Sequence, residues 1–438
     1  MRVSVAGIGY VGLVTAICLA EKGNLVTCVD IDKEKIELLN RGVSPIYEPQ
    51  LEELMWKNRE KIRYVSDYKE AYSDADVIII AVGTPEKKDG SVDLQYIYGV
   101  AKEVASAVIK DCVVAIKSTV PVGTNDKVER IIKENLKYKV NIDVVANPEF
   151  LSQGTAVKDT INATRIVLGS DSKNAENIMR EVYRDFEIPF VITDRKSAEM
   201  IKYASNDFLA LKISYINEIA NLCEIVGANI EDVTKGMGMD PRIGNHFLSA
   251  GIGYGGSCFP KDTQALHWLA RYNDYEIKTV KATIEVNENQ KIKLVKKARK
   301  YVNSFNGLNV AVLGLTFKPG TDDLREAPSL DNIPILLNEG AKINVWDPVG
   351  MDNFKKIYPN EVTYSTSIEE TITNADICLI FTEWKDIKEF DLEKYKKFMR
   401  RPLVIDGRNC YSIVDAQNSG IIYDSIGRKS TEKAISRV

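Results

Sequence analysis

The residues Gly251-Ile-Gly-Tyr-Gly-Gly-Ser-Cys-Phe-Pro-Lys-Asp262 combine a glycine-rich turn with a single cysteine and a nearby lysine. Glycines let a backbone adopt positive φ and approach a ligand closely. A structural cysteine is normally a small hydrophobe inside an apolar helix or strand, whereas Cys258 lies in a polar turn three residues before Lys261. A cation there favours the thiolate, the nucleophilic form. The stretch predicts a reactive cysteine; the alternative is a glycine turn that contains one by chance.

Lys202 and Asn206 are a second candidate pair. They are four residues apart in a helical pattern, so they point from one face of the helix. A buried cation and an amide donor on one face suit a developing alkoxide. The commoner alternative is a solvated lysine with an incidental asparagine.

The N-terminal residues have the order of a dinucleotide site. A β-branched strand, Val3–Ala6, runs into Gly7-Ile-Gly-Tyr-Val-Gly12; a helical pattern follows, and a second strand ends at Asp30. In such sites the glycines admit a pyrophosphate to a helix N-terminus and the acid binds the ribose hydroxyls. Asp30 would repel a 2′-phosphate, so the sequence predicts NAD rather than NADP.

Further strands are expected at 76–82, 113–118 and 142–146, because these are near-continuous apolar runs typical of buried parallel strands. Open α/β sheets bind ligands at the C-terminal ends of their strands. Those ends read Gly83-Thr-Pro85, Ser118-Thr-Val-Pro-Val-Gly-Thr124 and Asn147-Pro-Glu-Phe-Leu-Ser-Gln-Gly154. Glu149 in the last of them is a candidate base or water-orienting group, or else an ordinary solvated turn residue.

The middle of the chain is expected to be helical. Ser197 is a candidate cap for a helix that runs to about Gly227, long enough to connect two domains. Because this section lacks strand patterns, we expect it to serve as a spine and as a dimer surface.

The second half repeats the strand pattern of the first. The repeated strand segments are expected at Asn309–Leu315, Ile343–Asp347, Ala375–Phe381 and Leu403–Arg408. Gly314 lacks the rest of the glycine fingerprint, so this half should bind something other than a dinucleotide. Lys318, Arg325 and Arg408 follow strand ends, where cations can meet a diphosphate. The polar chain from Gly427 onward is expected to be loose.

Composition limits the class of protein. The chain has 438 residues, of which 45% are hydrophobic and 27% charged, with a net charge of −4. This balance argues against general nucleic-acid or anionic-membrane binding, and no apolar run is long enough to span a membrane. The N-terminus enters a strand at once, so no signal peptide is expected and the predicted location is cytoplasmic.

Cysteines and histidines are few and scattered. The seven cysteines form no CxxC pair and the two histidines are His246 and His267, so neither a disulfide framework nor a metal site is expected. Five cysteines lie in apolar segments and are expected in the core: Cys18, Cys28, Cys112, Cys223 and Cys378.

Over nearly its full length the chain resembles the UDP-glucose 6-dehydrogenase branch of the nucleotide-sugar dehydrogenases. Six motifs in order carry the resemblance: GxGYVG at Gly7–Gly12, STVPVGT at Ser118–Thr124, NPEFL at Asn147–Leu151, KYASNDFLALKISYINE at Lys202–Glu218, GGSCFPKD at Gly255–Asp262 and FKPGTDDLRE at Phe317–Glu326. The resemblance implies NAD as cofactor, a UDP-sugar substrate, a homodimer or higher homo-oligomer, and a product used in polysaccharide biosynthesis.

The expected fold is α/β, with two Rossmann-like doubly wound parallel-sheet domains joined by a long central helix and a helical middle domain. The expected limits are 1–195 for an NAD-binding domain, 196–302 for a helical central and dimerisation domain that carries the catalytic cysteine, and 303–438 for a UDP-sugar-binding domain.

The resemblance also implies roles for individual residues. Cys258 would be the nucleophile and Glu149 would work with the water of hydrolysis, and the rest of the catalytic set would be Lys202, Asn206, Asp262 and Thr119. Cofactor contacts are implied at Gly7, Gly9, Tyr10, Val11, Gly12, Asp30, Lys35, Thr84, Thr119, Gln153 and Arg325. Substrate contacts are implied at Glu149, Phe150, Leu151, Lys202, Asn206, Ser249, Tyr254, Gly255, Phe317, Lys318, Arg408 and, toward a neighbouring subunit, Arg242.

Three positions depart from the family pattern. Gln153 stands where relatives often have Glu, Gly83 where proline is common, and Ala163-Thr-Arg165 where Pro-Asp-Arg is usual. The first concerns an implied cofactor contact and so bears on NAD affinity. The GGSCFPKD motif favours UDP-glucose over N-acetylmannosamine nucleotides, although the sugar epimer stays open.

The implied chemistry is consistent with these residues. Turning a primary alcohol into a carboxylate removes four electrons, and a thiohemiacetal on Cys258 would keep the intermediate aldehyde from escaping. Three alternatives remain: a two-electron β-hydroxyacid dehydrogenase, which would need neither Cys258 nor the second α/β half, a non-catalytic sugar-nucleotide sensor, and a Cys-His hydrolase that uses His246.

Overall fold

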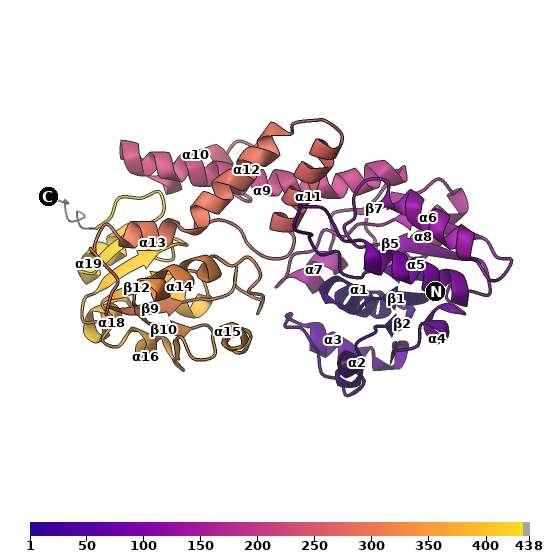
Figure 1. The fold of residues 1–438 in the computed structure, drawn as a ribbon, viewed down its shortest axis with the longest axis horizontal. Helices are drawn as coiled ribbons and strands as arrows, with labels where there is room; N and C mark the ends of the chain where they lie inside the picture. The colour runs from indigo at the N-terminus through magenta and orange to yellow at the C-terminus, as the bar shows by residue number, and fades with distance from the viewer. Residues whose placement is uncertain (432–438) are drawn as a thin grey trace. The chain divides into compact units, whose positions relative to one another are not determined.

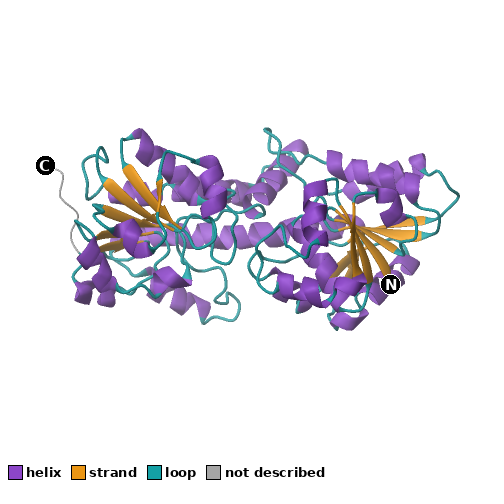
Figure 2. Ribbon diagram, turned by 90° about the horizontal axis from the view of Figure 1, so that it is seen from below, coloured by secondary structure: helices purple, strands orange, loops and turns teal. Residues whose placement is uncertain are grey.

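The computed structural model describes residues 1–431, which form two compact units. Unit 1 contains residues 1–205 and 268–274, and unit 2 contains residues 206–267 and the chain from 275 onward. Each unit is built on one sheet with helices on both faces (Figure 2).

Unit 1 has an eight-stranded sheet in the order β3-β2-β1-β4-β5-β6-β7-β8. Its strands are β1 (Arg2–Ala6), β2 (Leu25–Val29), β3 (Ile62–Val65), β4 (Val77–Ile80), β5 (Cys112–Ile116), β6 (Ile142–Ala146), β7 (Ile166–Gly169) and β8 (Phe190–Thr193). The first six positions have the Rossmann order 3-2-1-4-5-6 and pair in parallel. The predicted dinucleotide-type sheet is therefore confirmed.

The helices of unit 1 cover both faces of this sheet. They are α1 (Tyr10–Glu21), α2 (Lys33–Asn40), α3 (Leu51–Lys57), α4 (Tyr68–Tyr72), α5 (Gln95–Ala107), α6 (Thr124–Asn135), α7 (Ala156–Ile161) and α8 (Lys173–Val182), with short 3₁₀ turns η1 (Arg59–Lys61) and η2 (Arg184–Phe186). One core cluster joins the sheet to α1, α3, α7 and α8, and a second joins its other face to α4, α5 and α6. Figure 1 shows these helices around the strands.

The edge of this sheet differs from the expected parallel arrangement. Strand β7 pairs with β6 antiparallel, and β8 then pairs parallel with β7. The β6–β7 pairing is a single residue pair, Ala146 with Gly169. The apolar runs of the two added strands are only Ile166–Leu168 and Phe190–Ile192, which is too short for a clear strand pattern in the sequence.

Unit 2 repeats the same strand order in a second sheet, β11-β10-β9-β12-β13-β14, with every pair parallel. Its strands are β9 (Asn309–Leu313), β10 (Lys342–Trp346), β11 (Thr363–Tyr364), β12 (Ile377–Ile380), β13 (Leu403–Asp406) and β14 (Ile422–Ser425). The second Rossmann-like sheet is thus confirmed as well.

The remaining helices of unit 2 pack on its sheet or precede it. They are α10 (Ile230–Gly238), α11 (Phe259–Tyr272), α12 (Lys278–Lys291), α13 (Lys293–Ala298), α14 (Pro328–Asn338), α15 (Met351–Ile357), α16 (Ile368–Ile372), α17 (Lys385–Lys388), α18 (Leu392–Phe398) and α19 (Ile413–Ser419). The last five residues of α11 belong to unit 1.

The long predicted helix is α9 (Arg195–Val226), which passes from unit 1 into unit 2 between residues 205 and 206. The prediction that Ser197 caps it is wrong. Asp194 precedes the helix and accepts hydrogen bonds from the Ser197 main-chain N–H at 2.9 Å and hydroxyl at 2.6 Å. An aspartate bonded to the third helical N–H is the usual N-cap arrangement.

The chain is ordered beyond Gly427, so the expectation of a loose tail is wrong for residues 427–431. Arg428 is buried and donates to Glu231 at 2.7 Å, while Thr431 bonds to the main chain of Tyr423. The rest of the tail lies outside the described residues.

Candidate functional site

The glycine turn of unit 1 leaves room beside the first turn of α1. Gly7 has φ +87°, and a Cβ there would meet Val82 at 2.8 Å; a Cβ on Gly12 would lie 1.9 Å from the Gly7 carbonyl oxygen. A Cβ on Gly9 would meet nothing within 4 Å. No side chain caps α1, so its first N–H groups and its dipole are suited to a pyrophosphate.

Asp30 is held at the end of β2 facing this turn. Its carboxylate accepts from the Ile8 N–H at 2.7 Å and from the Asp32 N–H at 3.0 Å, and Lys35 Nζ lies 3.5 Å away. The predicted cofactor residue Lys35 therefore pairs with the predicted ribose acid. The glycine turn, the N-terminus of α1 and the fixed carboxylate of Asp30 together fit NAD.

Glu48 ties two other predicted cofactor segments together, and the sequence pattern did not single it out. Its carboxylate accepts from the Gly154 and Ala156 N–H groups, both at 2.7 Å, and from the Tyr10 hydroxyl. It thereby joins α1 to the loop that contains Gln153. Gln153 and Thr84 are both buried.

Glu149 and Lys202 meet inside unit 1. Lys202 Nζ lies 3.1 Å from Glu149 Oε1, and both side chains are buried. The Lys202 ammonium also lies 5.3 Å from the centre of the Phe150 ring. Three of the residues predicted for catalysis or substrate binding are thus adjacent.

Thr119 lines a small cavity that Lys202 also lines. The cavity measures about 10 Å³, and its other polar lining residues are Ser118, Asn125 and Glu199. This is close to the room one water molecule needs. Glu199, which the motifs did not single out, accepts from the Gly123 and Asn125 main-chain N–H groups at 2.6 and 2.8 Å. It fixes the loop of Thr119 to α9.

Cys258 lies directly before helix α11, because the Asp262 N–H bonds to the Cys258 carbonyl at 2.8 Å and the helix begins at Phe259. The sequence pattern indicated a turn with a nearby lysine and missed the helix start. A helix N-terminus favours a thiolate through its dipole. Cys258 is half-buried, whereas the five cysteines predicted for the core are buried, and within residues 1–431 none of the seven is in a disulfide.

Arg325 is a second cation near this thiol. Its carbonyl accepts from the Gly256 N–H at 2.8 Å, which places its backbone beside the cysteine loop. The pKa of Arg325 is raised, first by its hydrogen bond with Asp323 and further by the negative charge of Cys258. The resemblance implied a cofactor contact for Arg325, and within unit 2 its guanidinium pairs with Asp323 at 2.6 Å.

Asn206 and Asp262 are in contact in unit 2. Asn206 Nδ2 donates to Asp262 Oδ2 at 2.7 Å, and Lys261 Nζ lies 2.5 Å from Asp262 Oδ1. Asp262 is almost completely buried. Its two oxygens therefore orient an amide on α9 and a lysine on α11.

Asp207, the next residue along α9, was not predicted. It is buried, and within the described chain neither of its carboxylate oxygens has a hydrogen-bond partner. Burial, and then the negative charge of Asp262, raise its pKa to about 8. A carboxyl beside the candidate site is thus held in its neutral form near pH 7.

The predicted substrate residues of unit 2 converge on the glycine loop 251–256. Arg408 Nη1 donates to the Gly253 carbonyl at 3.1 Å and Nη2 to the Phe317 carbonyl at 3.3 Å. A Cβ on Gly256 would lie 2.8 Å from the Phe317 ring, which only glycine at φ +82° avoids. Lys318 Nζ lies 5.6 Å from the centre of that ring.

Two predicted residues lie on the surface instead. Ser249 is exposed, and the Arg242 guanidinium is exposed and pairs with Asp240 at 2.6 Å. Leu151 is half-buried, and its N–H donates to Glu149 at 2.7 Å.

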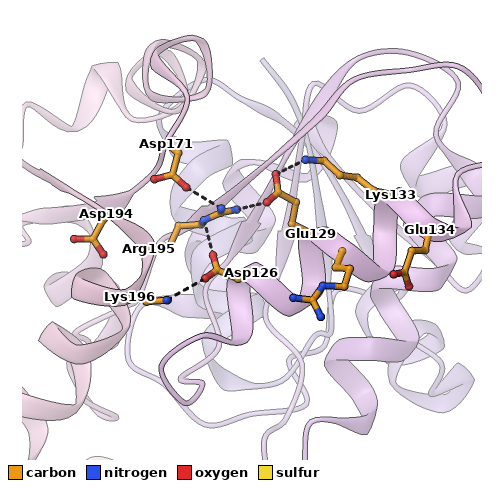
Figure 3. A pocket seen from close by; sticks show the side chains of 9 residues that line it. Asp126, Glu129, Lys133, Glu134, Asp171, Asp194, Arg195 and Lys196 are labelled. Carbon is orange, nitrogen blue, oxygen red and sulfur yellow. Dashed lines mark hydrogen bonds and ion pairs between the residues drawn. The ribbon is translucent and has the colours of Figure 1, made fainter.

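A hollow of about 670 Å³ in unit 1 is lined by none of the predicted residues. Figure 3 shows that most of its charged side chains form ion pairs centred on Arg195, Glu129 and Asp126. Arg195 reaches Asp126, Glu129 and Asp171 at 3.1, 2.9 and 2.8 Å. These pairs fasten the start of α9 to α6, and the hollow is best explained as this ion-pair network.

Residues 1–431 contain neither a cluster suited to a metal ion nor a helix suited to a membrane. No group of three or more His, Cys, Asp or Glu side chains is placed to hold a metal ion. None of the helices described is both long and apolar enough to cross a membrane.

Three successive parts of the chain match the three domains of one known protein family. Residues 1–187 match the NAD binding domain of the UDP-glucose/GDP-mannose dehydrogenase family, residues 196–289 its central domain and residues 311–413 its UDP binding domain. The chain is 49% identical over 432 residues to a UDP-glucose 6-dehydrogenase of Bacillus subtilis (strain 168), covering 98% of each. It is 44% identical over 437 residues to the UDP-glucose 6-dehydrogenase of Rhizobium meliloti (strain 1021), covering 98% of this chain and all of the other.

Solved structures show the same fold. A UDP-glucose dehydrogenase from Pyrobaculum islandicum matches with a TM-score of 0.92 at 35% identity, over 98% of each chain. A UDP-N-acetyl-mannosamine dehydrogenase from Staphylococcus aureus matches with a TM-score of 0.79 at 25% identity, over 97% of this chain and 98% of the other.

Proposed function

Because the chain belongs to the UDP-glucose/GDP-mannose dehydrogenase family and is an NAD-dependent oxidoreductase, we propose that it oxidises C6 of UDP-glucose to give UDP-glucuronate. The observation that carries the proposal is Cys258, at the start of α11 and at the end of a glycine loop that Arg408 and Phe317 contact. A two-electron dehydrogenase has no use for a thiol placed in this way. The domain limits 1–195, 196–302 and 303–438 are part of the proposal.

NAD, when bound, supplies the acceptor for one hydride in each oxidation. Gly7, Gly9 and Gly12 with the start of α1 would hold its pyrophosphate, and Asp30 its ribose. The further cofactor contacts proposed are Tyr10, Val11, Lys35, Thr84, Thr119, Gln153 and Arg325.

In the first oxidation, C6 loses a hydride and its hydroxyl loses a proton, which leaves an aldehyde. We assign the stabilisation of the developing alkoxide to the Lys202 ammonium and the Asn206 amide, one turn apart on α9. Asp262 orients that amide by accepting its N–H at 2.7 Å.

The Cys258 sulfur then bonds to the aldehyde carbon, and the aldehyde oxygen takes a proton, giving a thiohemiacetal. Loss of a second hydride and of that proton gives a thioester. Water attacks the thioester carbon, the C–S bond breaks, and the thiolate leaves. We assign Glu149 to orient this water and accept its proton. One alcohol, two NAD and one water become one carboxylate, two NADH and three protons.

The proposed enzyme is a homodimer or higher homo-oligomer. On the part of α9 in unit 2, Phe208, Tyr215 and Leu222 repeat every seven residues and are 60%, 49% and 52% exposed. Apolar side chains in such a stripe form helix–helix contacts. Light scattering after size-exclusion chromatography would show a dimer for the natural chain and a monomer for Phe208→Glu/Leu222→Glu. The seven cysteines, none of which is in a disulfide within residues 1–431, support a cytoplasmic location.

The decisive experiment counts NADH formed per UDP-sugar consumed across a panel of UDP-sugars. Two NADH per UDP-glucose, with little free aldehyde, is the expected result. Cys258→Ala should lose acid formation by several orders of magnitude and still bind NAD. Full acid production by Cys258→Ala would refute the covalent role, and one NADH per sugar would favour the two-electron dehydrogenase.

A further inference from the structure

Three buried amide side chains hold the loop that leads to Cys258. Asn217 on α9 and Asn287 and Gln290 on α12 have at most 2% of their surface exposed. Helix α12 contains no residue singled out by the sequence motifs. All three amides nevertheless bond to the main chain of the glycine loop.

The bonds are made at two points of the loop. At Gly251, the N–H donates to Asn217 Oδ1 at 2.8 Å and the carbonyl accepts from Gln290 Nε2 at 2.6 Å. At Tyr254, the N–H donates to Asn287 Oδ1 at 2.8 Å and the carbonyl accepts from Asn287 Nδ2 at 3.1 Å. Asn287 therefore fixes both peptide groups of Tyr254 with one side chain.

The N–H groups of the glycines on either side of Tyr254 stay unused. Gly253 and Gly255 are buried, yet within residues 1–431 neither main-chain N–H makes a hydrogen bond. A buried N–H without an acceptor is costly, so these two donors are suited to oxygen atoms of a ligand. A Cβ on Gly253 would lie 2.8 Å from Asn287 Oδ1, so the amide packs directly behind the first of them.

The same helix also fixes the segment on the other side of the loop. Lys291 is buried and lies 2.6 Å from a Glu326 carboxylate oxygen. Glu326 has φ +54°, and its carbonyl oxygen would be 2.2 Å from a Cβ on Gly255. Consecutive turns of α12 thus hold the glycine loop and the residue that it packs against.

We propose that Asn287 is a positioning residue for the sugar nucleotide: its amide sets the geometry of the loop whose free N–H groups bind the substrate and whose end carries Cys258. This inference rests on the proposed function. Asn287 acts through Tyr254 and Gly253, and it touches neither the substrate nor the thiol. Gln290 and Asn217 hold the start of the same loop.

The test is steady-state kinetics of Asn287→Ala with UDP-glucose and NAD. We expect the KM for UDP-glucose to rise about tenfold or more, as two lost hydrogen bonds would produce, while the KM for NAD changes by less than about twofold. Asn289→Ala is the matched control, because Asn289 is on the same helix, is exposed and bonds only within it, to the Glu285 carbonyl at 2.9 Å. It should behave as the natural chain does.

Asn287→Asp separates positioning from a general loss of folding. It keeps the shape and the acceptor for the Tyr254 N–H, but its ionised carboxylate repels the Tyr254 carbonyl, which a protonated carboxyl would not. Its KM for UDP-glucose should therefore be high at pH 8 and fall toward that of the natural chain at pH 6, whereas Asn287→Ala should show no such recovery.

The outcomes are distinguishable. An unchanged KM for UDP-glucose in Asn287→Ala overturns the inference. If that variant does not fold, an Asn287→Asp protein with the KM of the natural chain at pH 8 overturns it instead. A natural chain that forms no NADH with any UDP-sugar refutes the proposed function itself, and the inference with it.

Discussion

Lys202 Nζ lies 3.1 Å from Glu149 Oε1, with only 3% and 7% of the two side chains exposed. A buried ion pair repays its desolvation only while both partners are present. The pair joins α9 to the loop after β6, so the group proposed to stabilise the alkoxide also anchors the residue proposed to activate water. Catalysis and local stability are therefore linked at this contact.

Removing one partner of this pair should destabilise the protein more than removing both. We expect Lys202→Met to lower the free energy of unfolding by ~3–5 kcal/mol, because it leaves the Glu149 carboxylate buried without its ion pair. The double variant Lys202→Met/Glu149→Leu should recover much of that loss. Urea unfolding of the natural chain, the two single variants and the double variant gives the coupling free energy between Lys202 and Glu149. Strictly additive losses would show that the pair is not coupled.

Cofactor choice should depend on Asp30. Its carboxylate is fixed by the Ile8 N–H at 2.7 Å, where it would accept ribose hydroxyls and repel a 2′-phosphate. We expect the natural chain to prefer NAD strongly, and Asp30→Ser to reduce the ratio of kcat/KM for NAD over NADP. A natural chain with comparable kcat/KM values for the two cofactors would contradict this role.

Unit 2 offers a matched control for that experiment. Asp347 follows β10 as Asp30 follows β2, and it accepts from the Leu315 N–H at 2.7 Å. It also accepts from the Trp384 indole N–H at 3.0 Å. Its carboxylate is therefore already occupied by hydrogen bonds to protein groups. Asp347→Ser should lower stability without changing the ratio between NAD and NADP.

The strands that form the two sheets could be predicted because buried parallel strands are continuous apolar runs that alternate with helical patterns. The internal repeat also helped, since Asn309–Leu313 and Arg2–Ala6 both became the central first strand of a 3-2-1-4-5-6 sheet. What failed was short or locally ambiguous. The apolar runs of β7 and β8 are only Ile166–Leu168 and Phe190–Ile192, and Asp194 and Ser197 are equally good caps by residue type.

The candidate site was predictable where a residue type is unusual for its place, such as a cysteine in a glycine loop. It was not predictable where ordinary polar residues act through tertiary contacts. Glu48, Glu199 and Asn287 lie in unremarkable stretches, and their hydrogen bonds join segments 106, 76 and 33 residues apart. Only the folded chain shows which main-chain groups they satisfy.

Arg408 should be irreplaceable by lysine. Its guanidinium donates to the carbonyls of Phe381, Gly253 and Phe317 at 2.9, 3.1 and 3.3 Å, and only a planar fork can reach several acceptors at once. We expect Arg408→Ala and Arg408→Lys to raise the KM for UDP-glucose alike, by roughly ten- to a hundredfold, and to affect the KM for NAD little.

The lysine variant decides how Arg408 acts. A simple charge contact with the diphosphate would be largely restored by lysine, so recovery of the KM in Arg408→Lys would show that the carbonyl contacts are unimportant. Saturation kinetics with each substrate varied in turn measures the KM for UDP-glucose and the KM for NAD. A change mainly in the KM for NAD would show that the two α/β halves have been assigned the wrong ligands.

Asp207 should make stability fall as the pH rises. Its pKa in the folded protein is about 8, against an ordinary 3.8, because it is buried and lies near Asp262. Between these values the folded protein keeps a proton that the unfolded chain has lost, so unfolding releases a proton. The free energy of unfolding therefore decreases through this window, by up to about 1.4 kcal/mol per pH unit from this group, and the decrease ends above pH 8.

Asp207→Asn isolates this effect, because the amide has the shape of the protonated acid and does not titrate. Its stability should exceed that of the natural chain by a margin that grows steadily from pH 5 to pH 8. Urea unfolding at each pH measures the margin, and the exposed Asp274→Asn controls for the loss of one carboxylate. The sign is diagnostic: an aspartate stabilised as a carboxylate would make Asp207→Asn the less stable protein, by a margin that no longer changes above about pH 4. A margin that stays constant with pH would mean that Asp207 titrates alike in the folded and unfolded chain.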